Sequence, residues 1–179
     1  MQYFFVTGMG RSGSKFLSTL LQANDGICAK HEFIGNREFA LLTWYLEGQD
    51  YTFQYLKRAK REIDKDMRQC HTFIDVNGGL RNSVPELFKV FKPTRIYHLV
   101  RNPKKVVRSI FIRRNEMNIH EIPKEKANIE WWLDANKFSR ICWNWKNTTE
   151  KLLSQNTCLI KFEEIIFNYE YCYEKLLKP

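Results

Sequence analysis

Apolar residues fall in two patterns along the chain, short continuous runs and helically spaced positions. Residues 3–7 form a continuous run of β-favouring side chains, as in a strand that is buried on both faces of a parallel sheet. Glycines follow at once, and four apolar residues then recur at helical spacing: Phe16, Leu17, Leu20 and Leu21. Asn24-Asp25-Gly26 ends this helix. Strand, glycine-rich turn and helix together predict the opening of a βαβ unit.

The same patterns predict the later elements. Strands are expected at residues 72–76, 95–100 and 157–162. Helices are expected at residues 38–46, 51–68, 84–91, 104–114 and 129–153, with short helices over 163–178. Asp50 is the predicted N-cap of the second of these, and Ser83 with Glu86 resembles a capping box. Strands that alternate with helices, without an internal repeat, predict one α/β domain, a three-layer sandwich with a mostly parallel central sheet.

One segment carries neither pattern. Residues 115–126 are polar and include Pro123, so we expect a loop there, with a substrate lid as its candidate role.

Charge narrows the range of ligands. The chain has 179 residues, enough for one domain, and 29 Lys and Arg against 20 Asp and Glu give a formal charge of +9. Such an excess attracts nucleotides, nucleic acid, acidic polysaccharide or a membrane surface, without choosing among them. No apolar run reaches membrane-spanning length and no signal peptide precedes the first strand, so we expect a cytoplasmic protein.

Cysteine and histidine positions argue against disulfides and metals. The five cysteines are scattered, odd in number and without a Cys-x-x-Cys pair, so each is expected to be a free thiol in a reducing compartment. The four histidines show no metal-ligand spacing either. The prediction is that no metal is bound.

The segment after the first strand is the main candidate for chemistry. Its glycines let the main chain curl so that N–H groups point inward, and the following helix adds the positive end of its dipole. Two cations supply charge and two serines supply hydroxyl donors. The predicted phosphate-binding residues are Gly8, Gly10, Arg11, Ser12, Gly13, Ser14 and Lys15.

This loop departs from the Walker pattern. Gly8 and Gly13 have the Walker separation, but Ser14 and Lys15 stand in the reverse order. Phe16 follows Lys15, so the Ser or Thr that binds magnesium directly after the Walker lysine is missing. The sequence therefore indicates a poor ATP-hydrolysis loop.

The loop resembles the 5′-phosphosulfate loop of the sulfotransferases that use 3′-phosphoadenosine-5′-phosphosulfate (PAPS). A second motif also resembles that family: Leu99-Val100-Arg101-Asn102-Pro103, with Ser109 eight residues after the arginine. Softer similarities lie at residues 160–165 and 143–153. The layout is most similar to the carbohydrate and tyrosylprotein sulfotransferases.

The resemblance implies a fold like that of the P-loop NTPases and a function. PAPS would be the co-substrate, a sulfuryl group would pass to a hydroxyl or amine, and no metal would be needed. Arg101 and Ser109 would bind the 3′-phosphate of the nucleotide. The chain would be a single sulfotransferase-like domain over residues 1–179, truncated or minimal at its C-terminal end, because relatives continue further.

The resemblance also implies catalytic roles. Arg11 and Lys15 would stabilise the charge on the moving group, and Glu32, at the family's distance from the loop arginine, would be the general base. His31 is the competing base, since its unperturbed pKa lies nearer neutrality. Residues 75–79 lack the lysine that the family often has there.

Two other functions remain open at this point. A P-loop kinase or similar nucleotide-dependent transferase would bind ATP with magnesium, and a non-catalytic module would bind polyanions. The acceptor could be a small molecule, a lipid or a carbohydrate. No specific nucleic-acid partner is expected, and the oligomeric state is not predicted.

Overall fold

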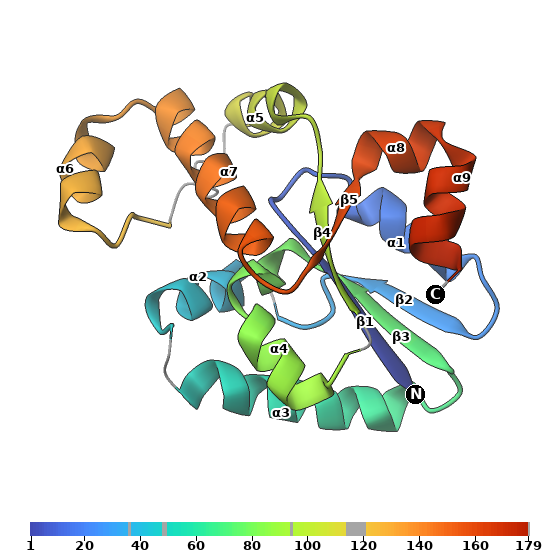
Figure 1. Ribbon diagram of the computed structural model, residues 1–179. Coiled ribbons are helices and arrows are strands. Elements are labelled where there is room, and N and C mark those ends of the chain that lie inside the picture. Colours follow the sequence, from blue (N-terminus) through green and yellow to red (C-terminus); the bar gives the residue numbers. More distant parts are fainter. Residues whose placement is uncertain (36, 48–49, 94, 114–120, 179) are drawn as a thin grey trace.

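The computed structural model describes residues 1–35, 37–47, 50–93, 95–113 and 121–178. In this part of the chain five strands form one sheet of order β2-β3-β1-β4-β5, and every pairing is parallel (Figure 1). The strands are β1 (Gln2–Thr7), β2 (Ile27–His31), β3 (Thr72–Val76), β4 (Arg95–Val100) and β5 (Cys158–Lys161). The predicted α/β fold with a parallel central sheet is therefore confirmed.

Both faces of β1 are covered, which explains its unbroken apolar sequence. Tyr3 and Phe5 point into one core and Phe4 and Val6 into the other, because successive side chains of a strand alternate between the faces. Phe5 is completely buried. A strand in the middle of a covered parallel sheet has no solvent face, so its sequence shows no polar alternation.

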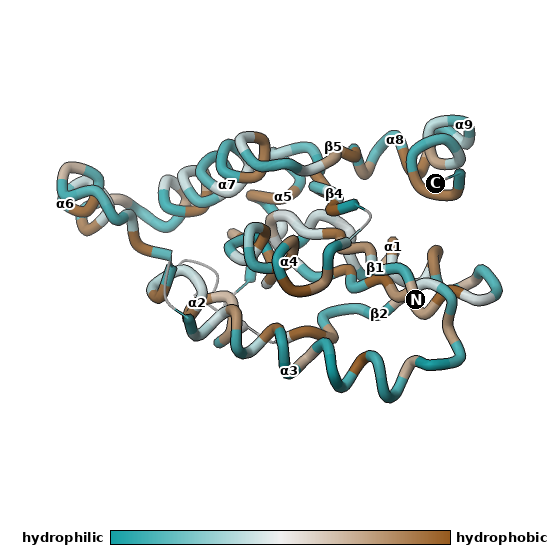
Figure 2. The backbone as a smooth tube through the Cα atoms, turned by 60° about the horizontal axis from the view of Figure 1, so that its bottom comes forward, coloured by the Kyte–Doolittle hydropathy of each residue, from teal (hydrophilic) through white to brown (hydrophobic). Residues whose placement is uncertain are grey.

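Helices form a layer on each face of the sheet. On the face of Phe5 lie α2 (Arg37–Tyr45), α3 (Asp50–Asp66), the 3-10 turn η1 (Gly78–Asn82) and α4 (Val84–Phe91). On the face of Phe4 lie α1 (Ser14–Gln22), α8 (Phe162–Phe167), α9 (Tyr169–Cys172) and the π-helical turn η3 (Tyr173–Leu177). Figure 2 shows mixed teal and brown along α3, as expected for a helix with one face in the core and one in water.

A third group of helices covers the end of the sheet where β1 and β4 finish. α5 (Pro103–Phe111) and α7 (Lys137–Leu153) lie there, and α6 (Lys126–Asp134) lies further out, where Trp132 packs against Trp143 of α7. Val106 and Ile110 of α5 pack with Ile141 of α7 around Met9, which comes from the glycine-rich loop. This small core fixes α5 above the loop.

Three expectations for the elements were wrong. β2 was not predicted, since its sequence ends in Lys30 and His31 and the strand lies at the edge of the sheet. The helix expected over 129–153 is two helices, and Asn136 caps the second by accepting the Ser139 N–H at 2.9 Å. Ser83 precedes α4 but makes no capping hydrogen bond through its side chain, so the capping box does not form.

The loop expected over 115–126 is only partly described. Residues 114–120 lie outside the described part, so the proposed lid is not placed. The helix predicted to end at residue 114 is α5, which ends earlier, at Phe111. The segment from Glu121 onward is described and reaches α6.

The prediction of free thiols is wrong for one pair of cysteines. Cys28 of β2 and Cys70, just before β3, form a disulfide with Cα atoms 5.8 Å apart. The parallel pairing of the two strands brings these residues together across 42 positions of sequence, which no local spacing reveals. Cys142, Cys158 and Cys172 are free.

A search of the described helices for one long and apolar enough to span a bilayer finds none.

Candidate functional site

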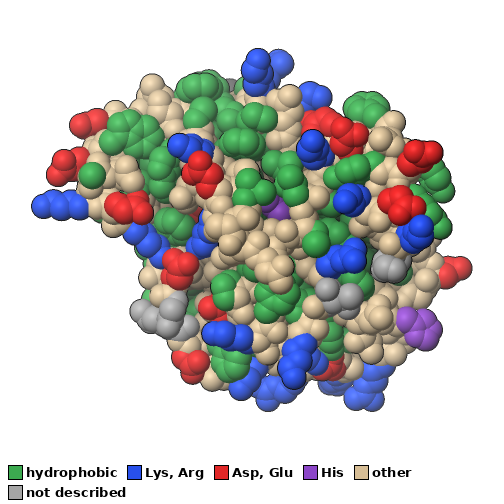
Figure 3. Space-filling model, in the orientation of Figure 1, with side chains coloured by type: hydrophobic (Ala, Val, Ile, Leu, Met, Phe, Trp, Pro, Cys, Tyr) green, Lys and Arg blue, Asp and Glu red, His purple; other side chains and the backbone are tan. Residues whose placement is uncertain are grey.

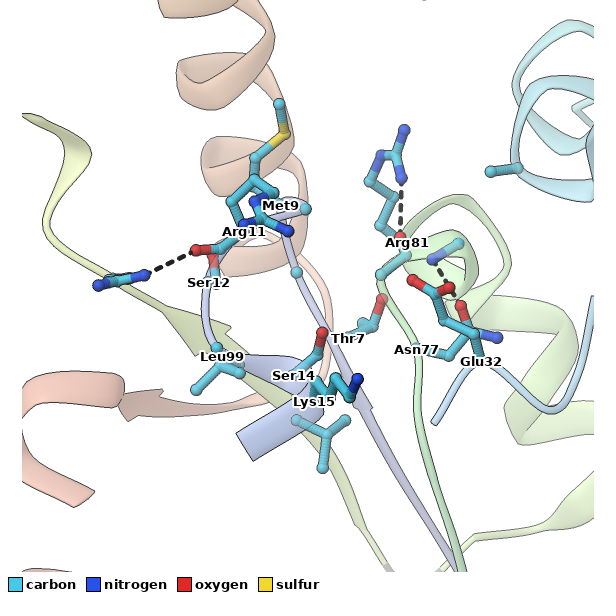
Figure 4. Close-up of a pocket in the computed structure, with 18 of the residues that line it drawn as sticks. Thr7, Met9, Arg11, Ser12, Ser14, Lys15, Glu32, Asn77, Arg81 and Leu99 are labelled. Atoms are coloured by element: carbon cyan, nitrogen blue, oxygen red, sulfur yellow. Dashed lines mark hydrogen bonds between the residues drawn. The ribbon is translucent and has the colours of Figure 1, made fainter. Parts of the chain in front are cut away.

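A cavity of about 580 Å³ opens where the carboxyl ends of β1, β3 and β4 meet. Open α/β sheets bind their ligands at this edge, beside the strand where the chain order reverses. The loop that follows β1 forms one side, and the turn after β3 together with Glu32 forms the other (Figure 4). Every residue predicted for the site lines this cavity except Ser109.

The glycine-rich loop is tightly wound against its neighbours. Gly13 has φ +99° and Arg11 has φ +73°, so the chain passes twice through the left-handed region. A Cβ on Gly13 would lie 2.0 Å from the Phe162 ring. Leu17 donates the first main-chain hydrogen bond of α1, to the Gly13 carbonyl at 3.1 Å. The N–H groups ahead of it therefore have no partner within the helix, which is the arrangement that anions bind.

Two buried hydroxyl groups face the same cavity without a protein partner. Ser12 is 3% exposed and Thr7 is 2% exposed, and neither side-chain oxygen has a hydrogen-bond partner in the described part of the chain. Buried hydroxyls are normally paired, so an unpaired one indicates a ligand or water position. Thr7, the last residue of β1, was not among the predicted site residues.

Arginines gather beside the loop. The Arg11 Nε–H donates to the Ser109 hydroxyl at 3.1 Å, and an Arg101 Nη1–H donates to the Arg11 carbonyl at 3.2 Å. Arg101 lies over the Phe162 ring at 4.9 Å, and Arg113 completes the group. Arg11, Arg101 and Ser109 were predicted for the site, and the structure brings them together. Arg113, two residues beyond α5, was not predicted, because it belongs to no recognisable motif.

The charge of this cluster is not neutralised by protein. Burial lowers the pKa of Arg11, and the neighbouring charges of Arg113 and Arg101 lower it further. Within the described residues none of the three forms an ion pair with a carboxylate. Like charges held this close repel one another, and an anion between them would relieve that repulsion, so the cluster has the chemistry that an anion site requires.

The opposite wall carries the two candidate bases. His31 and Glu32 follow one another at the end of β2, and the Ser14 hydroxyl and His31 Nε2 form a hydrogen bond of 2.9 Å. Glu32 lies 3.9 Å from the same nitrogen and is exposed in the cavity. Lys15, one residue into α1, also lines the cavity. The structure thus places Lys15, His31 and Glu32 around one space, and their catalytic roles stay predictions.

A further pair on this wall was not found from sequence. Arg81 of η1 donates to the Gly78 carbonyl at 2.8 Å and forms an ion pair of 2.6 Å with Glu121. Glu121 is only 2% exposed and also accepts from Asn82 at 2.9 Å. Forty positions separate Arg81 from Glu121, so only the fold could reveal the pair.

Two buried titratable groups near this edge respond to pH in opposite directions. Burial raises the pKa of Asp75, in β3, to about 6, and burial lowers the pKa of His98, in β4, to about 4. As pH falls, His98 takes up its proton near pH 6.5 in the unfolded chain but only near pH 4 in the folded protein. The free energy of unfolding therefore falls between pH 6.5 and pH 4. Folded Asp75 takes up its proton before the unfolded chain does, so it adds stability as pH falls from 6 to 3.8.

Replacing His98 should leave the contribution of Asp75 to the pH dependence of stability visible on its own. In His98→Gln the acid-side loss disappears, so the free energy of unfolding should rise from pH 6.5 to pH 4.5 relative to wild type, by about 2 kcal/mol. Urea unfolding at the two pH values measures this difference. A pH profile of His98→Gln that runs parallel to wild type would show that His98 does not titrate in this way.

Comparison with known proteins identifies the fold. Solved structures match, among them shikimate kinase from Bacteroides thetaiotaomicron, with a TM-score of 0.56, 12% sequence identity and 99% of both chains covered. No protein-family model matches the chain, and no curated protein does. At this identity the likeness establishes the fold alone, an α/β fold like that of a P-loop kinase.

The match corrects the sulfotransferase interpretation. The resemblance to the PAPS-dependent family, the sulfuryl transfer and the enzyme class that it implied are contradicted, because the whole chain superposes on a kinase fold and no comparison supports a sulfotransferase. The physical reason lies in the motifs. A glycine-rich loop and an arginine at a strand end serve any anion at this edge of the sheet, so they do not specify PAPS.

Metal ligands were also sought. Among the described residues no group of three or more His, Cys, Asp or Glu is placed to hold a metal ion.

Proposed function

We propose that this protein is a nucleotide-dependent phosphotransferase that binds the phosphates of ATP in the loop after β1 and passes the terminal phosphoryl group to a small-molecule acceptor. The observation that carries the proposal is the arginine cluster. Arg11, Arg101 and Arg113 line one cavity, and no carboxylate of the described residues pairs with them; the loop beside them begins α1, whose first N–H groups have no partner within the helix. The kinase-like fold supports ATP as the anion that belongs there.

The residues present fit a polyphosphate. Within the described part of the chain the hydroxyls of Ser12 and Thr7 have no acceptor, and the first N–H groups of α1 have none within the helix; a chain of phosphate oxygens would satisfy these donors. Lys15 adds a point charge on the same side. A cavity of about 580 Å³ lies within the usual range for small-molecule sites.

Magnesium accompanies ATP in this chemistry and neutralises charge on the phosphate oxygens. The reversed order of Ser14 and Lys15 does not remove a hydroxyl from the site, since Ser14 itself begins α1 and lines the cavity. Ser14 is the side chain whose oxygen would hold the ion, directly or through one of its waters. Mg²⁺ usually needs only one or two protein ligands.

The chain's own residues then take separate roles. Arg11 and Lys15 stabilise the charge that spreads over the transferred group. Glu32 accepts the proton of the acceptor hydroxyl, and we assign it this role because His31 is already engaged by the Ser14 hydroxyl. The acceptor would lie between Glu32 and Arg81, against Ala40 and Leu41.

Melting temperatures with added nucleotides test the function directly. We expect ADP and ATP with magnesium to stabilise the protein, and at 100 times the dissociation constant the gain is about 2.7 kcal/mol. For a domain of this size that raises the melting temperature by roughly 5–11 °C. Adenosine 3′,5′-bisphosphate, which has no phosphate chain, should give a smaller shift. A shift with the bisphosphate but not with ADP or ATP would overturn the proposal, and so would the absence of a shift with any of these nucleotides.

Polyanion binding is the contrasting outcome. On the face seen in Figure 3 the Lys and Arg side chains are scattered among hydrophobic and acidic ones and do not form a stripe that a polymer could follow. Binding to a nucleic acid that falls steeply with salt, without any nucleotide shift, would support that class.

A cytoplasmic location remains a prediction, and the disulfide between Cys28 and Cys70 is unusual there.

A further inference from the structure

Two buried polar residues, Asp75 and Asn77, lie behind the cavity wall that carries Glu32. Asp75, in β3, is completely buried, and its two oxygens accept the N–H groups of Phe33 at 3.0 Å and Ile34 at 2.9 Å. These are the two residues that follow Glu32 in the chain. Asp75 therefore determines the path of the main chain immediately beyond the proposed base.

Asn77 extends this contact toward the phosphate loop. Its amide donates to the Ile34 carbonyl at 2.7 Å and to Asp75 at 3.3 Å, and its side-chain oxygen accepts the Gly79 N–H at 2.8 Å. Figure 4 shows Asn77 beside Glu32 on the wall that faces Ser14 and Lys15. One hydrogen-bonded unit thus joins the Glu32 segment to the turn after β3.

The main chain of Glu32 has an unusual conformation. Its φ is +54°, in the left-handed region that a residue with a Cβ seldom adopts. Such a conformation persists only where the surroundings impose it, and it is concentrated at functional sites. Two sets of hydrogen bonds hold Glu32 in this conformation. The Glu32 N–H donates to the Val76 carbonyl at 3.3 Å, and Asp75 accepts the N–H groups of the next two residues.

We propose that Asp75 is a positioning residue for the phosphoryl-transfer reaction: by holding the N–H groups of Phe33 and Ile34, it keeps Glu32 in its left-handed conformation with the carboxylate in the cavity. This inference rests on the proposed function. Asp75 does not line the cavity and acts through Glu32.

A carboxylate is a costly residue for this place, which supports a specific role. Burial, and to a smaller extent the charge of Glu32, raise the pKa of Asp75, whereas the two N–H groups and the Asn77 amide oppose the rise. A carboxylate offers each of the two successive N–H groups an oxygen of its own, at Oδ1 for Phe33 and Oδ2 for Ile34. In Asp75→Asn the amide would meet one N–H with another donor, so one contact is lost while the shape is kept.

The first test follows the Glu32 carboxyl by ¹³C NMR, with its signal assigned through Glu32→Gln. In wild type we expect the signal to shift when ADP and magnesium are added, because the carboxylate shares the cavity with the phosphates. In Asp75→Asn we expect that response to fall at least threefold while the dissociation constant of ADP changes less than threefold. An unchanged response in a folded variant would overturn the proposal.

The second test is a double-mutant cycle on the hydrolysis of ATP with magnesium. We expect Asp75→Asn to lower kcat about tenfold with KM within threefold, and to cost less than twofold further in Glu32→Gln. An equal loss in both backgrounds would show that Asp75 contributes only to structure. If wild type binds ADP but hydrolyses too slowly to measure, the NMR response decides.

Two further variants test whether the effect is specific to the contact between Asp75 and the Glu32 segment. Asp64→Asn removes a carboxylate that bonds Tyr3 and Lys60 away from the cavity, and it should leave the Glu32 response intact. Asn77→Ser loosens the same segment and should give a weaker form of the Asp75→Asn effect if that variant does not fold. An intact Glu32 response in Asn77→Ser would then count against the proposal. Failure of the proposed function itself would appear earlier, as wild type that is not stabilised by ADP.

Discussion

Replacing Gly8 with alanine is expected to lower the free energy of unfolding by about 3 kcal/mol or more and to abolish nucleotide binding. The added Cβ would lie 2.3 Å from the carbonyl oxygen of Leu99, well inside contact distance. That oxygen belongs to the main chain of β4, beside β1, and cannot rotate away as a side chain would. Strand and loop would have to separate, which disturbs the sheet and the phosphate site together.

Gly10→Ala is the matched control for this variant. Gly10 lies two residues further along the same loop, and a Cβ there would meet nothing within 4 Å. Thermal unfolding of both variants measures the contrast, with roughly 6–12 °C expected for Gly8→Ala and little change for Gly10→Ala. Equal melting temperatures for the two variants would mean that the loop and β4 are not in the close contact described.

Replacing Arg11 with glutamine should weaken the binding of ATP by about 30- to 150-fold. A hydrogen bond to a charged group contributes about 2–3 kcal/mol, and Arg11 is the member of the cluster that belongs to the phosphate loop itself. Its Nε–H bond to Ser109 already fixes the direction of the guanidinium, so little freedom is lost on binding. Isothermal titration calorimetry with ATP and magnesium measures the change.

Arg108→Gln controls for the loss of one positive charge. Arg108 is exposed on α5, immediately before Ser109, and does not line the cavity. It should bind ATP as wild type does, and both variants should keep the wild-type melting temperature within about 2 °C without ligand, as is usual for surface substitutions. A similar loss in the two variants would assign the effect to the general field of the protein and not to the cluster.

The strands and the loop could be predicted because their signals are local. The unbroken apolar run of β1 and the glycines after it specify a buried strand and a tight turn wherever they occur. β2 gave no such signal, since an edge strand needs fewer apolar residues and Lys30 and His31 are polar. Its position beside β3 comes from pairing alone.

The site divides in the same way. Arg11 and Ser109 were found because each belongs to a short motif, whereas Arg81 and Glu121 meet only through the fold. The identity of the nucleotide was mistaken for a related reason. Arg101 at the end of β4 indicates a place where an anion could bind, but its chemistry is equally suited to several anions. Discrimination among them depends on the whole architecture, which two motifs do not contain.

The strand order also affects how the chain folds during synthesis. β1 pairs with β3 and β4 and with no nearer segment, so the ribosome releases it long before Thr72–Val76 and Arg95–Val100 exist. During that interval both its hydrogen-bonding edges are open, in a stretch that is almost wholly apolar. We therefore expect the nascent polypeptide to be most prone to aggregation before β4 emerges.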